Sequence, residues 1–584
     1  MDDAHHRGVG TPLHPVTPRH GPRRGLAAAP WLTVAAFALP VGTGLVGTLL
    51  PAFGILPALG RTEPSLAPWR ELVAQPGFAT SVRLTVTTGF AATVLSFLLA
   101  MGFCAWAWQR PLARRIGAWL APVLATPHSA LALGLAFLIA PSGWLLRMLS
   151  PWATGLDLPP DVATVGHPSG AALVLGLVVK EVPYLVLMTI GALSQVRADA
   201  ALAVSRALGY GRAATWCKVI VPQIYPQLRL PVYAVLAFSL SVVDVALILG
   251  PSNPPPLAVL AVRLFQDADL RFWFPAAAAA TLQLAIAVAA IALWRGGEIV
   301  AGRAGRAWVE RGRRDAALAT VATAAGAATV ALALLAVLAI AGMALWSFAT
   351  QWRFPDALPS GFTLSHWVRL TAGLAGPAAT TLAVGAVATL VALVLAIACL
   401  EHEADVPRRE RPPALSLLYL PLLVPQVAFL FGMQVLLVHA GWDGTFAAVA
   451  WAHLVFVLPY LFLSLADPWR AFDPRIAQAA ASLGASRWRT FLRVKLPLLA
   501  RPLLIAVAVG FAVSVGQYLA TLFAGAGRVA TLTTEAVTLA SGADRRVIGA
   551  YAFVQGLLPW LVYLAAVLVP ALLFANRRGV ARLG

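Results

Sequence analysis

Charged residues are scarce in this chain of 584 residues, since only 11% are Asp, Glu, Lys or Arg while 60% are hydrophobic. An ordinary soluble domain has about 25% charged residues, so the composition excludes a soluble globular protein. Cysteine is nearly absent: Cys104, Cys217 and Cys399 lie far apart. That spacing excludes a disulfide framework and a CxxC metal site, and we expect no metal ligands.

The chain also lacks a GxxxxGK[ST] phosphate-binding loop. We therefore expect no catalytic residues, no enzymatic activity and no cofactor bound by this chain. Acidic residues are few as well, with 24 Asp and Glu against 43 Lys and Arg, for a net charge of +19. On a soluble chain this excess would suggest a nucleic-acid partner. Here the basic residues lie in short tracts between apolar runs, so the lipid bilayer, and no nucleic acid, is the expected partner.

Long apolar runs fill the rest of the sequence, and a membrane-spanning helix needs about 20 apolar residues. The chain is predicted to be an all-α integral membrane protein with about twelve transmembrane helices. In the first half the spans lie near residues 29–53, 78–107, 118–140, 168–194, 230–250 and 273–294. In the second half they lie near 317–347, 373–400, 414–437, 445–467, 501–523 and 548–574.

The distribution of basic residues predicts the orientation of these spans. With a cytoplasmic N-terminus, the inner segments hold 31 Lys and Arg residues and the outer loops hold 10. Cytoplasmic loops of membrane proteins carry such an excess, so both termini are expected in the cytoplasm. The first apolar run is too long for a secretory signal and lacks a convincing cleavage site, which indicates a retained span.

The sequence is an internal tandem repeat. Pro127-His128 matches Pro425-Gln426 at an offset of 298, and Pro183-Tyr184 matches Pro459-Tyr460 at an offset of 276. Both halves have the same topology, so the repeat is parallel, with an axis along the membrane normal. The expected domains are a cytoplasmic tail (1–28), a first repeat (29–300), a basic cytoplasmic linker (301–316) and a second repeat (317–584).

The longest basic inner loops within each half occupy the same position, between the fourth and fifth spans. They cover residues 195–229 and 468–500, and each has thirteen residues from a glycine to a proline. An Ala-rich helix, a left-handed turn at the glycine and a second short helix capped by Ser486 are expected. The prolines suit the first turn of the next span. The glycines are Gly209 and Gly484, and the prolines are Pro222 and Pro497.

These loops resemble the cytoplasmic signature of permeases from binding-protein-dependent ABC importers, which reads Glu-Ala-Ala, then Gly, then Pro. The corresponding triplets are Ala203-Val204-Ser205 and Gln478-Ala479-Ala480, so the glutamate is absent from both copies. The whole chain is similar to the fused permeases of iron(III) and thiamine importers. The alternative is that the loops are only basic cytoplasmic connections between spans. Their identical Gly-to-Pro spacing favours the coupling role that the resemblance implies.

The resemblance implies a type I ABC importer permease in the bacterial inner membrane. In that family the signature loop docks on an ATP-hydrolysing subunit, so two cytoplasmic ABC ATPase subunits that bind ATP are expected as partners. An external, periplasmic solute-binding protein is the other expected partner. The substrate stays open, with iron(III), thiamine, phosphonate and polyamine among the candidates.

Charged residues inside spans are costly and normally face a partner or a wet cavity. Lys180 and Glu181 lie in the fourth span and Asp244 lies in the fifth. Two roles are possible for these charged side chains. They could form an interhelical ion pair, such as Lys180 with Asp244, or they could contact the substrate. His128 and Gln426, which the repeat pairs, are weaker candidates for the path lining.

Twelve spans in two parallel halves also describe a secondary transporter of the major-facilitator type. That class would couple transport through intramembrane carboxylates and needs no ATPase. Its longest inner loop lies between the halves, whereas here the matched loops lie between the fourth and fifth spans of each half. The loop positions therefore favour the ABC permease.

Overall fold

The computed structural model describes residues 26–108, 110, 120, 123–314, 317–406, 418 and 420–573. Most of the expected cytoplasmic tail, the starts of the third and ninth spans and the residues after 573 lie outside this part. Across the described residues the chain is helical, and β-structure there is limited to two isolated bridges, Leu56 with Arg61 and Ala349 with Phe362.

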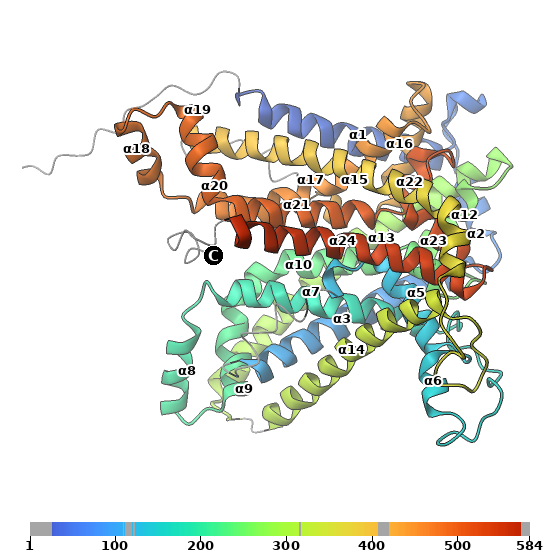
Figure 1. The fold of residues 1–584 in the computed structure, drawn as a ribbon, viewed down its shortest axis with the longest axis horizontal. Helices are drawn as coiled ribbons and strands as arrows, with labels where there is room; N and C mark the ends of the chain where they lie inside the picture. Colours follow the sequence, from blue (N-terminus) through green and yellow to red (C-terminus); the bar gives the residue numbers. More distant parts are fainter. Residues whose placement is uncertain are drawn as a thin grey trace, which may run out of the picture.

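Each predicted span has a helical counterpart (Figure 1). In the first half they are α1 (Ala29–Ala52), α3 (Phe78–Ala107), α5 (His128–Ile139), α7 (Ala171–Leu193), α10 (Val221–Ser241) with α11 (Asp244–Leu249), and α13 (Trp273–Glu310). In the second half they are α14 (Ala317–Phe348), α15 (Ser365–Asp405), α16 (Val427–His439), α17 (Phe446–Arg470), α21 (Ala500–Val515) with α22 (Leu519–Gly525), and α24 (Arg545–Leu573).

Shorter helices join these spans: α2 (Ala67–Val73), α6 (Trp144–Leu149), α12 (Leu257–Phe265) and α23 (Leu532–Leu539). Within the described ranges, nine helices are long and apolar enough to cross a membrane, or ten if one bent pair is a single span. The two expected spans that this criterion leaves out are α10 and the shorter α16. The chain is therefore a multi-pass, all-helical membrane protein.

The fifth span of each half is not the continuous helix that the hydropathy predicts. In the first half it breaks between Ser241 and Asp244, and in the second half between Val515 and Leu519. The residues in the first break are Val242 and Val243. Because they are as apolar as the helices around them, a hydropathy window cannot detect the interruption.

The two halves exchange helices. Helix α14, the first span of the second half, packs on α3 and α5 of the first half, and α1 correspondingly packs on α16. Figure 1 shows α14 among the helices of the first half and α1 beside α15 and α16. The α1–α16 crossing is so close that a Cβ on Gly47 would lie 2.9 Å from the Cα of Gly432. Small residues permit such approach of helix backbones in membranes, so the halves interlock.

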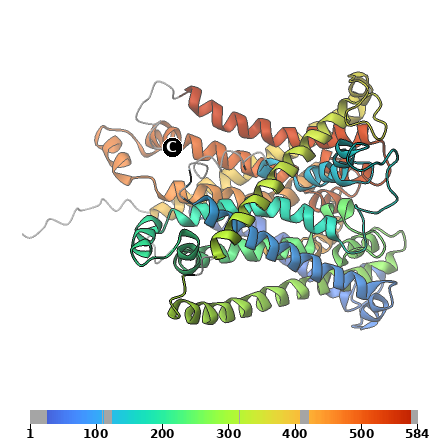
Figure 2. The same ribbon diagram turned by 90° about the horizontal axis from the view of Figure 1, so that it is seen from below.

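Two short helical hairpins lie at the same end of the bundle, apart from each other. They are α8 (Ala198–Ala207) with α9 (Arg212–Thr215), and α18 (Pro474–Ser482) with α19 (Arg487–Thr490). Figures 1 and 2 show both hairpins, teal and orange, at the same end from two directions. Helix α13 continues to Glu310, so most of the expected linker 301–316 is a helical extension of the sixth span. Ala, Arg and Glu in this stretch favour the helix.

Candidate coupling loops and translocation path

The two hairpins are the segments 195–229 and 468–500, named here the first and second coupling loops. Gly209 and Gly484 have φ angles of +79° and +82°, which confirms the left-handed turn expected at each. Both turns are Schellman motifs, in which two backbone amides close on carbonyls of the preceding helix. The amide of Gly209 donates to Arg206 and that of Tyr210 to Ser205, and the amides of Gly484 and Ala485 donate to Ala481 and Ala480.

The predicted cap at Ser486 is present, since its side chain accepts a hydrogen bond of 3.3 Å from the amide of Arg489. Pro222 lies in the first turn of α10 as expected. Pro497 differs, because it lies in the three-residue helix α20 (Leu496–Leu498), after which the chain bends by 73° into α21. The two loops thus share their turns but enter the bundle differently.

The signature triplets lie on α8 and α18. Ala203, Val204, Gln478 and Ala479 are exposed, Ser205 is buried, and Ala480 is partly buried. Large apolar side chains beside them are exposed too: Val204 by 63%, Leu208 by 60%, Leu483 by 89% and Trp488 by 65%. Clustered exposed apolar residues mark interaction surfaces, so the loops have the character of a docking surface.

A short π-helical turn follows each hairpin, at Trp216–Ile220 and at Phe491–Lys495. The two turns lie at equivalent places in the repeat, and π-turns are frequent at functional sites. The sequence gives no periodicity from which a five-residue π-turn could be predicted.

The first coupling loop packs against the segment that joins the halves. The hydroxyl of Tyr210 donates to the carbonyl of Gly312 at 3.1 Å, and the ammonium of Lys218 donates to the carbonyl of Arg313. The same ammonium lies 4.5 Å from the ring centre of Trp308. Consequently the first loop is attached to the chain that enters α14.

The second coupling loop is attached elsewhere. Lys495 forms an ion pair with Glu401 near the end of α15, and its ammonium lies 4.6 Å from the ring centre of Trp469. In the described part of the chain α18 buries none of its residues, whereas α8 buries Ala198, Leu202 and Ser205. Sequence reasoning did not find Lys218 or Lys495 as anchors, because their partners lie 95 and 94 residues away.

Lys180 does not pair with Asp244, which corrects one of the two readings of the intramembrane charges. Its ammonium donates to the carbonyls of Val123 at 2.9 Å and Leu124 at 2.8 Å, and also to that of Thr126. These carbonyls lie just before Pro127, which has no N–H and disfavours helix at the residue before it. Lys180 therefore satisfies carbonyls left open where the third span is interrupted.

Glu181 contacts His128, the other sequence candidate on the first half. The His128 Nε2 and Glu181 Oε1 atoms lie 3.6 Å apart, and the two side chains are 34% and 8% exposed. The His128 ring centre lies 4.7 Å from that of Phe238. Asp244 is buried at the start of α11. The structure thus brings His128 and Glu181 together, while Lys180 binds backbone carbonyls.

Gln426 is the N-cap residue of α16 and is partly buried. Its backbone carbonyl accepts hydrogen bonds from Phe429 and Leu430. Its partner in the repeat, His128, begins α5 instead. The structure therefore keeps Gln426 and His128 at matched positions but brings only His128 to a carboxylate.

At the opposite end of the bundle an Asp-x-Arg pair begins the sixth span of each half. Arg546 binds Asp544 through Nε and Oδ2 at 2.9 Å, and Arg271 binds Asp269 through the same atoms at 2.9 Å. These guanidinium contacts hold the pKa values of both carboxyl groups below the ordinary value. Sequence reasoning missed the motif, although Asp269 and Asp544 are related by the repeat offset of 275.

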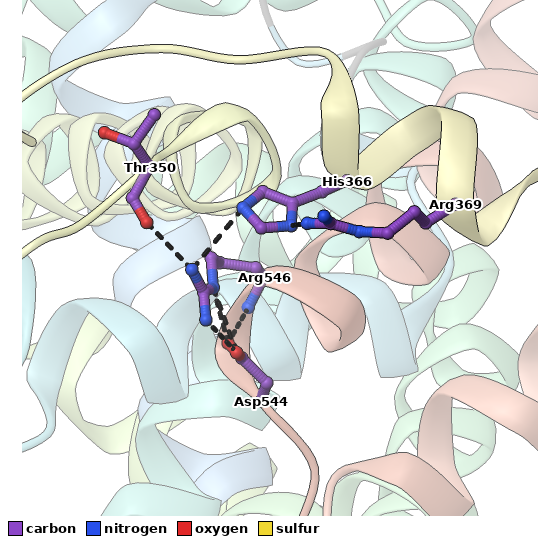
Figure 3. Close-up of polar contacts among 5 residues, drawn as sticks. All are labelled: Thr350, His366, Arg369, Asp544 and Arg546. Carbon is purple, nitrogen blue, oxygen red and sulfur yellow. Dashed lines mark hydrogen bonds and ion pairs between the residues drawn. The ribbon is translucent and has the colours of Figure 1, made fainter.

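The pair of the second half is built into a larger cluster (Figure 3). Arg546 also donates to the carbonyl of Thr350 at 2.8 Å and lies 3.4 Å from Nε2 of His366. The opposite ring nitrogen of His366 lies 2.6 Å from Arg369. The cluster therefore joins the start of α24 to the loop after α14. Among the described residues no group of three or more His, Cys, Asp or Glu side chains could hold a metal ion.

Comparisons with known proteins agree with this geometry. The family described as binding-protein-dependent transport system inner membrane component matches residues 408–576. The chain is 32% identical over 554 residues to the inner membrane ABC transporter permease protein YnjC of Escherichia coli K12, covering 94% of this chain and 97% of YnjC.

Two further relatives match a smaller part of the chain. The putative 2-aminoethylphosphonate transport system permease protein PhnV of Salmonella typhimurium is 30% identical over 179 residues, or 30% of this chain and 67% of PhnV. The spermidine/putrescine transport system permease protein PotC of Escherichia coli K12 is 28% identical over 127 residues, or 22% of this chain and 45% of PotC. The major-facilitator alternative finds no support in these comparisons. The chain therefore belongs to the family of binding-protein-dependent ABC transporter permeases, as a fused permease that forms the membrane path of an importer.

Proposed function

We propose that each coupling loop docks one ATPase subunit and that an external binding protein delivers the solute to the opposite end of the bundle. The observation that carries this proposal is the pair of matched helix-turn-helix loops at one end (Figure 1). Two docking sites on one chain suit a pair of similar ATPase subunits. In this arrangement the ATPase subunits bind and hydrolyse ATP, and the permease binds no cofactor.

The charge distribution supports the orientation. In the sequence, the inner segments, which include both coupling loops, hold 31 Lys and Arg residues, against 10 in the outer loops. By the positive-inside rule, the end that carries the coupling loops, and both termini, face the cytoplasm of a bacterial inner membrane, where ATP is available. The opposite end, with α6 and the Asp-x-Arg pairs, then faces the binding protein.

The transported solute is a small molecule or ion. Among the relatives, PhnV is named for 2-aminoethylphosphonate transport and PotC for spermidine and putrescine transport. One of these solutes carries an anionic group and the other is cationic. Relatedness alone therefore does not decide the charge of the solute that this chain transports.

Cysteine cross-linking tests the docking. Ala203 and Ala479 are exposed on α8 and α18, and Ala153 is exposed at the opposite end of the bundle. With ATPase subunits that carry a surface cysteine in their docking cleft, we expect Ala203→Cys and Ala479→Cys to cross-link to them and Ala153→Cys to remain free. Cross-links from Ala153→Cys alone, or from none of the three, would overturn the proposal.

A further inference from the structure

Glu298 joins two helices of the first half through four hydrogen-bond donors. It lies on α13, and its carboxylate accepts from the hydroxyls of Tyr225 and Tyr233, both at 2.9 Å, and from Nε of Arg229 at 3.0 Å. These three donors lie on α10, and Arg295 of α13 donates to the same carboxylate. The Glu298 side chain is 6% exposed. Glu298 and its four donors, named here the Glu298 clamp, therefore hold α10 against α13.

The donors of the clamp follow the helical repeat of α10. Tyr225, Arg229 and Tyr233 are four residues apart, so they lie on one face of the helix and cover successive turns. Arg229 and Arg295 bring two positive charges to the one negative charge of Glu298. A carboxylate can be buried where it is paired and hydrogen-bonded in this way.

The clamped stretch of α10 contains two prolines. Pro226 and Pro231 lie inside this helix, and each lacks an N–H and so removes an intrahelical hydrogen bond. Prolines inside helices are a common cause of kinks, yet α10 is a single helix from Val221 to Ser241. The donors to Glu298 lie before, between and after the two prolines. The clamp therefore supports α10 where its own hydrogen bonds are missing.

Aromatic side chains extend the contact to a third helix. Nε1 of Trp294 on α13 donates to the hydroxyl of Tyr225 at 3.1 Å. The ring of Phe97 on α3 lies edge-on to both rings, with its centre 5.9 Å from that of Tyr225 and 6.4 Å from that of Trp294. Edge-to-face contacts of this kind are favourable beyond the area that they bury. The junction of α10 and α13 is thus packed against α3 as well.

Helix α13 also contacts the first coupling loop itself. Beyond Glu298 it continues to Glu310, and Trp308 in this extension has its ring centre 4.5 Å from the ammonium of Lys218. Lys218 lies in the π-helical turn that leads directly into α10. The loop, α10 and α13 therefore form one closed set of contacts, in which each member is joined to the other two.

The second half has no equivalent of the clamp. The four positions that correspond to Tyr225, Arg229, Tyr233 and Glu298 at the repeat offset of 275 hold Ala500, Leu504, Ala508 and Leu573. None of these four side chains can donate or accept a hydrogen bond. At this place the chain bends by 73° between α20 and α21. The second coupling loop therefore meets its fifth span at a bend, whereas the first loop continues into a clamped helix.

We propose that Glu298 is a positioning residue for coupling, which holds α10 on α13 so that the first coupling loop moves together with the fifth and sixth spans of its half. The proposal rests on the docking of ATPase subunits proposed above and names the path by which the first loop acts. A force on this loop then reaches the bundle without bending α10 at Pro226 or Pro231. At the second loop the bend before α21 absorbs the displacement, and Lys495 transmits it to Glu401 of α15 instead.

The number of solute molecules taken up per ATP hydrolysed tests the clamp, in proteoliposomes that hold the permease, the ATPase subunits and the binding protein. Glu298→Gln keeps the size of the side chain but removes its charge, so it should lower this ratio roughly fivefold while ATP hydrolysis continues. Tyr225→Phe with Tyr233→Phe leaves both ion pairs in place and should lower the ratio about twofold. Glu310→Gln, exposed at the end of the same helix, is the matched control and should leave the ratio unchanged.

A covalent bridge distinguishes positioning from a merely structural role. In a chain whose three native cysteines are replaced by alanine, Arg229→Cys with Glu298→Cys removes the clamp and places one thiol on each helix. We expect little uptake per ATP from this variant, recovery when a short bis-methanethiosulfonate reagent bridges the two thiols, and renewed loss after reduction. A bridge would not reverse misfolding, so recovery identifies the connection between α10 and α13 as the property that coupling needs.

Cross-linking at the coupling loops shows which proposal fails. A normal ratio in Glu298→Gln at normal expression, a parallel fall of uptake and hydrolysis, or a bridged variant that does not recover would overturn the role of the clamp. Cross-links from Ala203→Cys that persist beside such a result would leave the docking proposal intact. Absence of these cross-links from a chain with native Glu298 would overturn the docking proposal, and with it this inference.

Discussion

The hydroxyl of Tyr210 and the carbonyl of Gly312 form a hydrogen bond of 3.1 Å that ties the first coupling loop to the segment between the halves. That segment leads directly into α14, which packs on α3 and α5 of the first half and on α24 of the second. The first loop is therefore connected through this segment to helices of both halves. The second loop is tied to the end of α15 through Lys495 and Glu401.

The unequal support of the two loops predicts unequal mobility. Few buried contacts mean a low free energy of local opening, and α18 buries no residue while α8 buries three. In the permease without ATPase, we expect backbone amides of α18 to exchange with deuterium roughly tenfold faster than those of α8. Mass spectrometry of the exchanged protein measures this. Equal rates in the two helices would contradict the prediction.

The hydrogen bond from Tyr210 can be removed by deleting one oxygen atom, the hydroxyl of its side chain. Tyr210→Phe should raise exchange in α8 and lower the local stability by about 1 kcal/mol, the usual net value of such a bond. Tyr563 in α24 has no hydrogen bond recorded for its hydroxyl in the described structure, so Tyr563→Phe is the matched control. The control should change neither helix, and a Tyr210→Phe protein with native exchange in α8 would show that the bond has no bracing role.

The turn of the second loop depends on glycine. Gly484 has φ of +82° with open space around it, so a side chain would be strained by backbone conformation rather than by a clash. The left-handed region costs a non-glycine residue about 1–2 kcal/mol. We expect Gly484→Val to keep the protein in the membrane and to retain ATPase activity while ATP-driven uptake falls. Both activities are measured in proteoliposomes with the ATPase subunits and the binding protein.

Gly441 provides the control for that experiment. It has φ of +65° and open space as well, but it lies in the loop between α16 and α17. Gly441→Val should leave the ratio of uptake to ATP hydrolysis unchanged. Normal uptake by Gly484→Val at normal expression would mean that the loop does not couple hydrolysis to transport.

The orientation can be read from reporter fusions. The excess of Lys and Arg in the inner segments of the sequence predicts cytoplasmic signals after residues 215, 305 and 490. Fusions after residues 160 and 540 should report the outer side. An outer signal at 215 or 490 would exclude contact between the loops and an ATP-driven subunit.

The pair of Asp544 and Arg546 predicts a weak dependence of stability on pH. Hydrogen bonds from Arg546 lower the pKa of Asp544, so the carboxylate stabilises the fold above the unfolded pKa of about 3.9. That contribution is lost as the pH falls through the lower, folded pKa. Because the Asp544 side chain is 42% exposed, the effect should stay below about 1 kcal/mol.

The measurement compares the Tm of Asp544→Asn with that of the native protein across this pH range. Near neutral pH the variant should unfold at a slightly lower temperature, and the difference should vanish once the native carboxyl is protonated. Asp161→Asn, at an exposed site, should show no difference at either end of the range. A pH-independent difference for Asp544→Asn would mean that the ion pair is not its cause.

Hydropathy and turn chemistry predicted much of this architecture, because each acts within a few residues along the chain. The spans follow from apolar length, and the turns at Gly209 and Gly484 follow from the conformational freedom of glycine. The break at Val242–Val243 escaped prediction because apolar residues fill it, and the break at Gly516–Tyr518 escaped because it is short and lies between apolar runs. The exchange of α1 and α14 and the anchors Lys218 and Lys495 depend on contacts between distant segments, which local patterns do not encode.

The contacts of Lys180 also could not be predicted from local sequence patterns. They can be tested by measuring how much folded protein a substitution leaves in the membrane. The length and charge of Lys180 indicated a charged partner, but its ammonium binds the carbonyls of Val123, Leu124 and Thr126. Lys180→Met relieves a buried charge but leaves these carbonyls without a donor, at about 1–3 kcal/mol for each that stays unsatisfied. We expect several-fold less folded protein in the membrane, measured by fluorescence-detected size exclusion.

Adding Asp244→Leu separates the two explanations of that loss. If the carbonyls are the cause, the double variant should be no more abundant than Lys180→Met, because Asp244 plays no part in satisfying them. An ion pair between the two residues would instead give recovery in the double variant, since removing both charges removes the penalty of an unpaired one. Arg83→Met, at an exposed position of α3, should leave the abundance unchanged and controls for the loss of a basic residue from a span. Recovery in the double variant would restore the pair of Lys180 with Asp244.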